Sequence, residues 1–379
     1  MGSSLRRAAL LASLCFLLAA SAKSQSKWLV VEFPHDSPVL MVSSGLGPTT
    51  ARVRGTSMEL DLHASVMLRN TGTKTISGLT LRVEAQDLTP SGKGSVTVPS
   101  LDAQPGQIFP VRIDMELLRP FNAATNSGAV VQVSLDCVLF NDLSSYGPDK
   151  LDSRRALMVY ELEARRDRHY LANLLAAGKL SELREELNFG LQDLSLQQLG
   201  LELLHEPRPQ FQREQDVSVG AVSFPSSPVL TMGGAAHVWG NEVRAPQVEV
   251  KNRSQKSIRS IEMGWIVRDE RGRDFVAGAV PAAMQLAPVE TARMTEPGTL
   301  RFSRPAGQPM VIGGLLAFVN DVEFADGKLW IPSRLDIKEA TQDPTLRRAL
   351  ATSPEQQKLA EIYRRKGMSG LAEELKKPE

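Results

Sequence analysis

The alternation of hydrophobic and polar residues along the chain predicts mainly β-strands. Between Met58 and Leu68 every second residue is apolar, and the residues between them are mostly polar. This period of two is typical of a strand that buries one face. Similar alternation recurs at Leu79–Ala85 and Val131–Leu139, and Gly-, Asn-, Asp- and Ser-rich turns separate the runs. The pattern favours an antiparallel β-sandwich, immunoglobulin-like in outline, with a small barrel as the structural alternative.

The chain contains this pattern twice. Ser37–Leu40 recurs as Ser227–Leu230. Further matching pairs are Asn70 with Asn252, Asp87 with Asp269, Val98-Pro99 with Val280-Pro281, Asn141-Asp142 with Asn320-Asp321, and Glu185–Leu187 with Glu373–Leu375. By the same comparison we align the strand Val131–Leu139 with Met310–Phe318, so that Cys137 corresponds to Leu316. Two copies indicate a duplication, because a solenoid needs at least about three stacked repeats.

A helical part follows the strands in each copy. Residues 153–176 lack Pro and Gly, and a second helix is expected from Ser181 to about Leu187, after Gly178. In the second copy, Ser353 begins a capping box with proline at the first helical position, and Gly367 is expected to end that helix. Residues 188–206 continue with Leu-rich spacing and are assigned to the helical part.

We therefore expect a mostly β protein with helical segments (α+β), made of two tandem antiparallel immunoglobulin-like β-sandwiches, each followed by a short helical segment. The predicted divisions are a signal peptide at 1–22, sandwich copy one at 28–152, helical segment one at 153–205, a linker at 206–216, sandwich copy two at 217–337 and helical segment two at 341–377.

The N-terminus has the features of a secretory signal. Arg6 and Arg7 precede an apolar run that ends in the small residues Ala20-Ser21-Ala22. Cleavage after Ala22 would remove Cys15 and leave Cys137 as the single cysteine, so no internal disulfide is expected. We expect an exported protein, periplasmic or extracellular, with no membrane insertion after cleavage. Lys plus Arg number 44 and Asp plus Glu 43, which argues against a nucleic-acid partner.

One segment of each copy resembles a known pattern. In the second copy Asn252 begins a turn, Asp269 ends an alternating strand and Gly272 follows. Trp265, Val267 and Arg268 stand where Phe, Leu and Tyr stand in bacterial exported immunoglobulin-like modules of the FxLYD type. The first copy matches at Asn70, Gly72, Lys74, Ile76 and Asp87 and departs at Val83, Gln86 and Pro90. The resemblance implies an exported immunoglobulin-like sandwich and carries over no catalytic residues.

The sequence lacks the motifs that usually carry catalysis, including the phosphate-binding loop, His-Glu-x-x-His and Gly-x-Ser-x-Gly. The histidines lack the short spacing of helical metal ligands; they are His35, His63, His169, His205 and His237. Cys137 is interpreted as a core residue rather than a nucleophile, because it lies at an inward strand position. No catalytic, cofactor-binding or metal-binding residue is predicted, and no cofactor is expected.

Several recurring charged residues have two interpretations. Asp142, Asp321, Asp149 and Asp326 fit turn capping better than a calcium site. Capping is also preferred over a carboxylate pair for Asp87 and Asp269. The pairs Arg154-Arg155 and Arg347-Arg348 fit either anion sites or, as we prefer, a solvated helix face paired with Glu161, Glu163 and Asp167.

Aromatic residues and one acceptor motif complete the candidates. Trp265 is expected in the core, whereas Trp330, after the Asp326-Gly327 hairpin, is the better exposed candidate for carbohydrate stacking; Trp239 is the third such residue. Asn252-Arg253-Ser254 fits either a glycosylation acceptor or a plain turn.

These features favour a non-catalytic protein of the cell envelope, a protein-interaction or scaffold module with an unidentified protein partner. Two copies would raise avidity if both engage one target. The alternatives are a hydrolase with a site between the two copies and a carbohydrate-binding protein.

Overall fold

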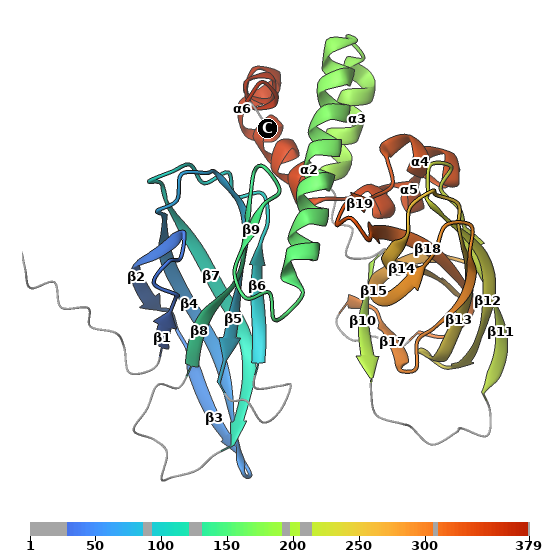
Figure 1. The fold of residues 1–379 in the computed structure, drawn as a ribbon, viewed down its shortest axis with the longest axis horizontal. Helices are drawn as coiled ribbons and strands as arrows, with labels where there is room; N and C mark the ends of the chain where they lie inside the picture. Colours follow the sequence, from blue (N-terminus) through green and yellow to red (C-terminus); the bar gives the residue numbers. More distant parts are fainter. Residues whose placement is uncertain are drawn as a thin grey trace, which may run out of the picture. The chain divides into compact units, whose positions relative to one another are not determined.

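The computed structural model describes residues 29–85, 93–120, 131–191, 198–204, 214–305 and 310–377. The chain divides into two compact units, Met1–Arg154 and Arg155–Glu379. Strands predominate over helices, which confirms the mostly β, α+β class (Figure 1). The predicted signal at 1–22 lies outside the described residues, as does most of the predicted linker at 206–216.

The first unit is built from strands. They are β1 (Leu29–Glu32), β2 (Val39–Leu46), β3 (Thr50–Arg54), β4 (Ser57–Asn70), β5 (Ile76–Glu84), β6 (Lys93–Val98), β7 (Ile108–Pro120), β8 (Val131–Phe140) and β9 (Ser145–Tyr146).

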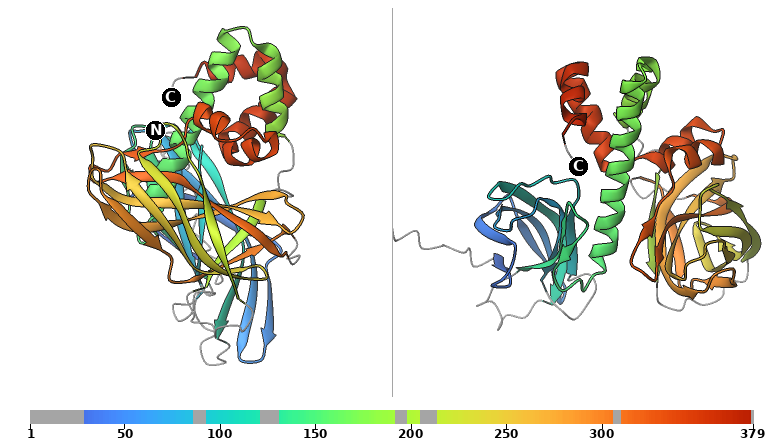
Figure 2. Two further views of the ribbon diagram at one scale, coloured as in Figure 1. Left: turned by 90° about the vertical axis from the view of Figure 1, so that its right-hand side faces the viewer. Right: turned by 45° about the horizontal axis from the view of Figure 1, so that its top comes forward.

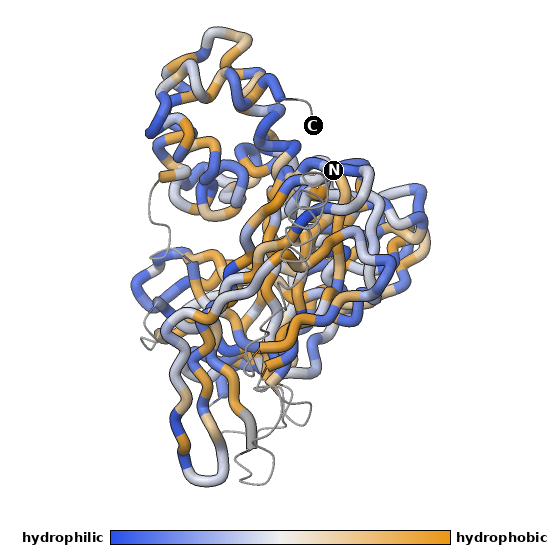
Figure 3. Tube along the Cα trace, turned by 90° about the vertical axis from the view of Figure 1, so that its left-hand side faces the viewer, coloured by the Kyte–Doolittle hydropathy of each residue, from blue (hydrophilic) through white to orange (hydrophobic). Residues whose placement is uncertain are grey.

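Two sheets enclose the core of this unit. One has the order β1-β8-β5-β6 with β9 on β8; in the other, β4 pairs with β2 and β3 along one edge and with β7 along the other. Leu60 and Leu68 of β4 and Leu79 and Leu81 of β5 lie in one buried cluster, so the predicted alternation is confirmed here. Figure 3 shows hydrophobic and hydrophilic stretches alternating along the strands.

The described residues of the second unit include ten strands and most of the helical residues. The strands are β10 (Gln198–Leu204), β11 (Gln215–Val222), β12 (Val229–Trp239), β13 (Glu242–Asn252), β14 (Ile258–Asp269), β15 (Asp274–Leu286), β16 (Thr291–Thr295), β17 (Thr299–Ser303), β18 (Ile312–Phe324) and β19 (Leu329–Trp330). The helices are α2 (Ser153–Ala176), which begins at the boundary between the units, α3 (Leu180–Gly190), α4 (Arg334–Ala340), α5 (Pro344–Ala351) and α6 (Pro354–Leu375).

The strands of the second unit form one sheet that closes on itself. Its order is β11-β12-β13-β17-β10-β15-β14-β18-β19, and a further parallel pairing joins β11 to β18. The hydrogen bonding of this copy therefore corresponds to the barrel alternative. Strand β10 completes the ring between β15 and β17. The assignment of all of 153–205 to a helical segment was wrong for Gln198–Leu204, whose Leu199 and Leu201 contribute to the interior of the ring.

The predicted alignment of the last long strand was also wrong. Val131 pairs with Leu29 of β1, and the equivalent parallel pairing in the second unit joins Leu315 to Val219 of β11. Val131 thus corresponds to Leu315 rather than Met310. Leu316 and Phe318, predicted inward, face a separate cluster with Ile337 of α4 and Leu346 of α5. The error arose because both faces of β18 are apolar, so parity alone does not define its register.

The turn after the long strand has the same hydrogen bonds in both copies. Asn70 Nδ2 donates to the carbonyl oxygens of Lys74, at 2.9 Å, and Ala103, at 2.8 Å. Asn252 Nδ2 donates to Lys256, at 2.8 Å, and to Leu286, at 3.1 Å. Each Asn satisfies the backbone of its own turn.

The helices of the two copies pair with each other. Arg168 of α2 donates to the carbonyl oxygen of Glu374 at 2.6 Å, and Gln356 of α6 donates to that of Glu186 at 3.1 Å. These contacts are reciprocal, because Glu186 and Glu374 are equivalent by the repeat. In Figure 2, α2 and α3 (green) face α6 (red) in both views. The shared core consists of Leu171, Leu174, Leu183, Leu187, Leu359, Ala360 and Leu371.

Gly367 ends the first helical stretch of α6, as predicted, and a second stretch follows it. It has φ 68° and lies at a kink inside α6, after which the chain returns to helix. Gly178, with φ 69°, lies between α2 and α3 at the equivalent point of the first copy. Glycine adopts this backbone region without steric penalty, which is why each helical segment folds back on itself there.

Candidate functional site

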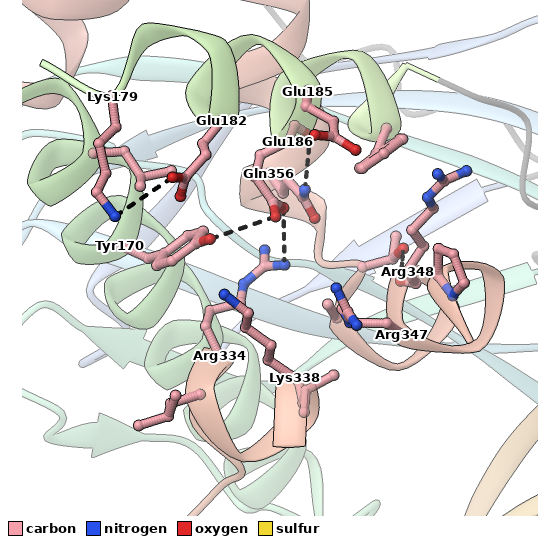
Figure 4. Close-up of a pocket in the computed structure, with 17 residues that line it drawn as sticks. Tyr170, Lys179, Glu182, Glu185, Glu186, Arg334, Lys338, Arg347, Arg348 and Gln356 are labelled. Atoms are coloured by element: carbon pink, nitrogen blue, oxygen red, sulfur yellow. Dashed lines mark hydrogen bonds and ion pairs between the residues drawn. The ribbon is translucent and has the colours of Figure 1, made fainter. Parts of the chain in front are cut away.

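The helices of the second unit enclose a pocket of about 370 Å³ (Figure 4). The ends of α2 and α3 form one wall, and α4, α5 and the start of α6 form the other. Its charged and polar lining residues include Tyr170, Lys179, Glu182, Glu185, Glu186, Arg334, Lys338, Arg347, Arg348 and Gln356. The acidic residues come from α3, whereas the arginines come from α4 and α5.

Asp167 holds the two walls together beneath this pocket. It is fully buried and accepts from Arg334 Nε at 2.7 Å and from Arg166 Nε at 2.8 Å. Burial alone would raise the pKa of Asp167, but Arg334 and Arg166 outweigh it and hold the pKa below its usual value. Ser353, the N-cap of α6, also donates to this carboxylate. One charge thereby anchors the first residue of α4 and the start of α6 to α2.

The acidic wall centres on Glu186. Its carboxylate lies 3.8 Å from Arg334 Nη1 and accepts from the Tyr170 hydroxyl at 3.4 Å. Burial raises the pKa of Glu186, although Arg334 and Tyr170 oppose the shift. Burial, with the nearby Glu186 charge, raises the pKa of Tyr170 to about 12. Tyr170 therefore stays protonated at neutral pH and acts as a hydrogen-bond donor in the pocket.

The basic wall carries donors suited to anions. The Arg348 guanidinium lies over the Phe189 ring, 3.4 Å from its centroid, and Arg347 donates to the Thr341 carbonyl oxygen at 3.4 Å. Arg347 Nε is buried and makes no hydrogen bond with any described residue. Adjacent guanidinium groups bind carboxylate or phosphate through paired N–H donors.

A second buried charge cluster lies where α2 covers the sheet. Arg155 pairs with the fully buried Asp321 of β18 and lies 3.6 Å from Glu262 of β14. Burial, reinforced by Asp321, raises the pKa of Glu262 well above its usual range. Burial also raises the pKa of Glu163 to about 7. The Arg155 guanidinium thus lies beside two carboxyl groups of the sheet. Asp321 carries the balancing charge, and Glu262 remains protonated at neutral pH.

This cluster predicts pH-dependent stability. The folded state holds protons on Glu262 and Glu163 that the unfolded chain releases near about pH 4.3, so stability falls as pH rises from about 5 to above 7. Glu262→Gln, which mimics the protonated acid, should be more stable than the parent by about 1–3 kcal/mol at pH 9 and nearly equal at pH 5. Urea unfolding followed by tryptophan fluorescence measures this difference. Glu249→Gln, an exposed site on β13, is the control, and an equal gain there would contradict the assignment.

The structure places the sequence candidates as follows. Cys137 is buried, and burial raises its pKa to about 12, so it is no thiolate at neutral pH. Its counterpart is Asp321 rather than Leu316, because Cys137 pairs with Thr80 on β5 and Asp321 pairs with Glu262 on β14. The two sites differ because α2 supplies Arg155 to balance the aspartate.

The recurring turn aspartates are ion-paired. Asp142 and Asp326 are the equivalent pair, bound to Lys74 Nζ at 2.6 Å and Lys256 Nζ at 2.7 Å. The predicted match of Asp142 with Asp321 was therefore wrong. Asp149 accepts from the Arg154 backbone N–H at 2.8 Å. Across the described ranges, no group of three or more His, Cys, Asp or Glu side chains could hold a metal ion.

Asp269 caps its turn, since it accepts the backbone N–H groups of Arg271 and Arg273, each at 2.9 Å. Asp87, its predicted counterpart, lies outside the described residues. His63 pairs with Asp114 at 2.8 Å, and His237 pairs with Asp216 at 2.6 Å. These two histidines lie in separate units.

The preferred interpretation of the arginines as a solvated face was wrong for Arg155. It is buried, and it pairs with Asp321 and Glu262 rather than with Glu161 or Asp167. Glu161 pairs with Arg165 at 2.9 Å. Arg347 and Arg348 line the pocket described above, which corresponds to the anion-site alternative.

Of the tryptophans, Trp265 is buried in the core, as predicted. Trp330 is half-buried against Phe224, with ring centroids 6.4 Å apart, whereas Trp239 is 42% exposed, so the expectation for Trp330 was wrong. Asn252 is fully buried, so its side-chain nitrogen has no room for a glycan. The turn interpretation of Asn252-Arg253-Ser254 is the one the structure supports.

Sequence reasoning missed Glu186, Tyr170 and Arg334 as pocket residues. Glu186 belongs to the repeated Glu-Glu-Leu motif, which was the one available signal. Arg334 follows Ser333, which is the N-cap of α4 in a capping box with Asp336. The local sequence therefore indicates that Arg334 begins a helix, but it does not indicate that Glu186 lies beside it.

None of the described helices is both long and apolar enough to cross a membrane. No family model matches the chain, and no curated protein matches it. Among solved structures, a protein titled pT26-6p is 8% identical, covers 76% of this chain and 64% of its own, and has a TM-score of 0.17. A β-glucosidase from Kluyveromyces marxianus is 11% identical over 73% of this chain and 44% of its own, with a TM-score of 0.16. Such low scores do not indicate a shared fold.

Proposed function

We propose that this protein is an exported, non-catalytic interaction module of the cell envelope, and that the helical pocket of its second unit binds an acidic segment of a partner protein. The observation that carries the proposal is the basic wall of α4 and α5. There Arg347 and Arg348 lie side by side in sequence at a pocket, with the buried Arg347 Nε making no hydrogen bond with a described residue. A carboxylate of the partner would pair with the guanidinium N–H groups of Arg347 and Arg348 that line the pocket.

The acidic wall supports binding to a protein rather than to a simple anion. Glu182 and Glu185 of α3 line the same pocket as Arg347, so opposite charges lie on opposite walls. A polypeptide carries carboxylates together with amide and basic groups and can satisfy both walls at once. The predicted signal supports recognition outside the cytoplasm, and we propose that both copies descend from one immunoglobulin-like sandwich.

An oligo-glutamate peptide provides the probe. Arg347→Gln combined with Arg348→Gln should weaken its binding about tenfold or more, measured by fluorescence anisotropy on the full chain. Arg364→Gln combined with Arg365→Gln, at the exposed adjacent arginines of α6, is the matched control and should change affinity less than about twofold. An equal loss in both double variants would mean that general charge attraction, and not the pocket, accounts for binding.

A hydrolase is the second candidate, favoured by one observation. Glu186 is a half-buried carboxyl with a raised pKa beside Arg334 and Tyr170, and such perturbed acids are frequent in active sites. Turnover of a substrate by the pure protein that Glu186→Gln abolishes, with peptide binding retained, would favour this alternative over the interaction module.

A further inference from the structure

The two copies differ at one edge of the β-structure, where the second unit has an additional strand. In the second unit, β10 lies between β15 and β17, parallel to the first and antiparallel to the second (Figure 1). Leu199 pairs with Ala277 of β15, and Leu203 and Leu204 pair with Leu300 and Thr299 of β17. This strand comes from the segment that connects the copies and is not part of the duplicated β-pattern.

Shared registers identify the same place in the first unit. Trp265 of β14 pairs with Ala277, and its counterpart Val83 of β5 pairs with Gly94 of β6. Likewise β13 pairs with β17 in the second unit, as β4 pairs with β7 in the first. The edges that flank β10 in the second unit therefore correspond to β6 and β7 in the first.

In the first unit a groove of about 440 Å³ lies between these two strands. It is lined by Lys93–Thr97 and by Arg112 and Asp114–Leu117. Among the described pairings, β6 bonds to β5 and β7 bonds to β4, so each stands at the edge of its sheet. Edge strands present backbone groups to which another strand can hydrogen-bond.

We propose that this groove accepts an extended segment of a partner protein, which adds as a strand parallel to β6 and antiparallel to β7. In strand addition of this kind, backbone hydrogen bonds provide the affinity and alternate side chains provide the specificity. The second unit shows the product of such an addition within the same chain. In the sequence, β10 precedes β11 by a short spacing. The residues that precede β1 by the same spacing fall within the predicted signal at 1–22, so export would leave the first copy without an equivalent strand.

The groove defines the chemistry of the incoming segment. In β10 the alternate residues Leu199, Leu201 and Leu203 face the core, so the segment needs apolar residues at every second position. Leu201 lies over Gly278, and a Cβ atom at that glycine would be 3.5 Å from the Leu201 Cβ. The Met115 side chain covers Gly94 in the first unit, and a Cβ atom at that glycine would be 2.9 Å from the Met115 sulfur. Methionine is flexible enough to move aside for an incoming leucine.

Charge distinguishes this segment from β10. The exposed face of β7 along the groove carries Asp114 and Glu116, which alternate with Met115 and the buried Leu117. Leu204 lies on the face of β10 opposite the inward leucines, so a basic residue at that position would lie on the same face as these carboxylates, and opposite charges on neighbouring strands are favourable. The inferred occupant is thus an apolar, alternating segment with a lysine or arginine at its C-terminal end, unlike the acidic segment proposed for the helical pocket.

The test uses synthetic peptides of the Gln198–Leu204 sequence with the mature full-length protein. The Leu204→Lys peptide should bind about two- to fivefold more tightly than the Leu204→Glu peptide, and Glu116→Lys in the protein should reverse that order. Glu270→Lys, an exposed turn residue of the second unit, is the matched control and should leave the order unchanged. Bound peptide should also slow amide hydrogen exchange in β6 and β7.

Disulfide trapping checks the register. With Glu116→Cys in the protein, a Leu204→Cys peptide should cross-link at least about fivefold faster than a Leu203→Cys peptide, whose thiol points to the opposite face. The buried Cys137 does not compete. Equal cross-linking by both peptides, or exchange protection elsewhere than β6 and β7, would overturn the proposal. The Arg347→Gln and Arg348→Gln variant should bind the strand peptide normally, so this inference and the proposed function fail separately.

Discussion

Replacing Arg155 with leucine should lower the free energy of unfolding of the second unit by about 3–5 kcal/mol. Asp321 is fully buried, and the substitution removes the guanidinium that balances its charge. Burying an unpaired carboxylate is costly, so the side chain would take up a proton or the end of α2 would separate from β14 and β18. Urea unfolding at pH 7 by tryptophan fluorescence measures the loss, because Trp239, Trp265 and Trp330 lie in this unit.

The control for this prediction is Arg259→Leu. Arg259 belongs to β14, is 63% exposed and lies 3.6 Å from Glu323, so its loss should change stability by less than about 1 kcal/mol. Adding Asp321→Leu to Arg155→Leu should restore most of the stability, since apolar replacements of buried ion pairs are often neutral. A double variant no more stable than the single one would show that the cost comes from packing and not from the unpaired charge.

Asp167→Asn should destabilise the helical module by about 3–5 kcal/mol. Asparagine keeps the shape but removes the charge that pairs with Arg166 and Arg334, both of which have side chains only 9% exposed. Arg334 is the first residue of α4, and Ser353, which also binds this carboxylate, caps α6. The loss should therefore appear first as faster amide hydrogen exchange in α4 and at the start of α6, with the sheet still protected.

Glu361→Gln is the corresponding control. This side chain, 39% exposed, pairs with Arg364 and Arg365 on the surface of α6 and should contribute less than about 0.5 kcal/mol. Uniform loss of protection across the sheet and the helices in Asp167→Asn would indicate that the unit unfolds as a whole and that Asp167 does not act locally. Because the pKa of Asp167 is held below its usual value, the pair with Arg334 should persist down to mildly acidic pH and weaken only as that carboxylate is protonated.

Local patterns predicted much of the fold and little of the site. Alternation at Met58–Leu68 and the boundaries of α2 depend on neighbouring residues, and both predictions were confirmed. Strand β10 was assigned to a helix because Leu-rich spacing over 188–206 suits either state, and its pairing with β15 and β17 decided between them. The pocket joins Glu186 of α3 to Arg334 of α4, and no local spacing indicates that these residues meet.

The sequence by itself determined the mostly β class, the repeated strand and turn pattern and the beginnings of α2 and α6, because alternation, turn residues and capping residues act over a few neighbouring positions. Tertiary structure decided which charges are buried together, since Arg155 with Asp321 and Asp167 with Arg334 are brought together from distant parts of the chain. It also decided that one copy closes around β10 while its sibling keeps a groove between β6 and β7. Two nearly equivalent patterns differ in this way because a single additional strand satisfies the edges of one copy, whereas no strand among the described residues lies between β6 and β7 of the other.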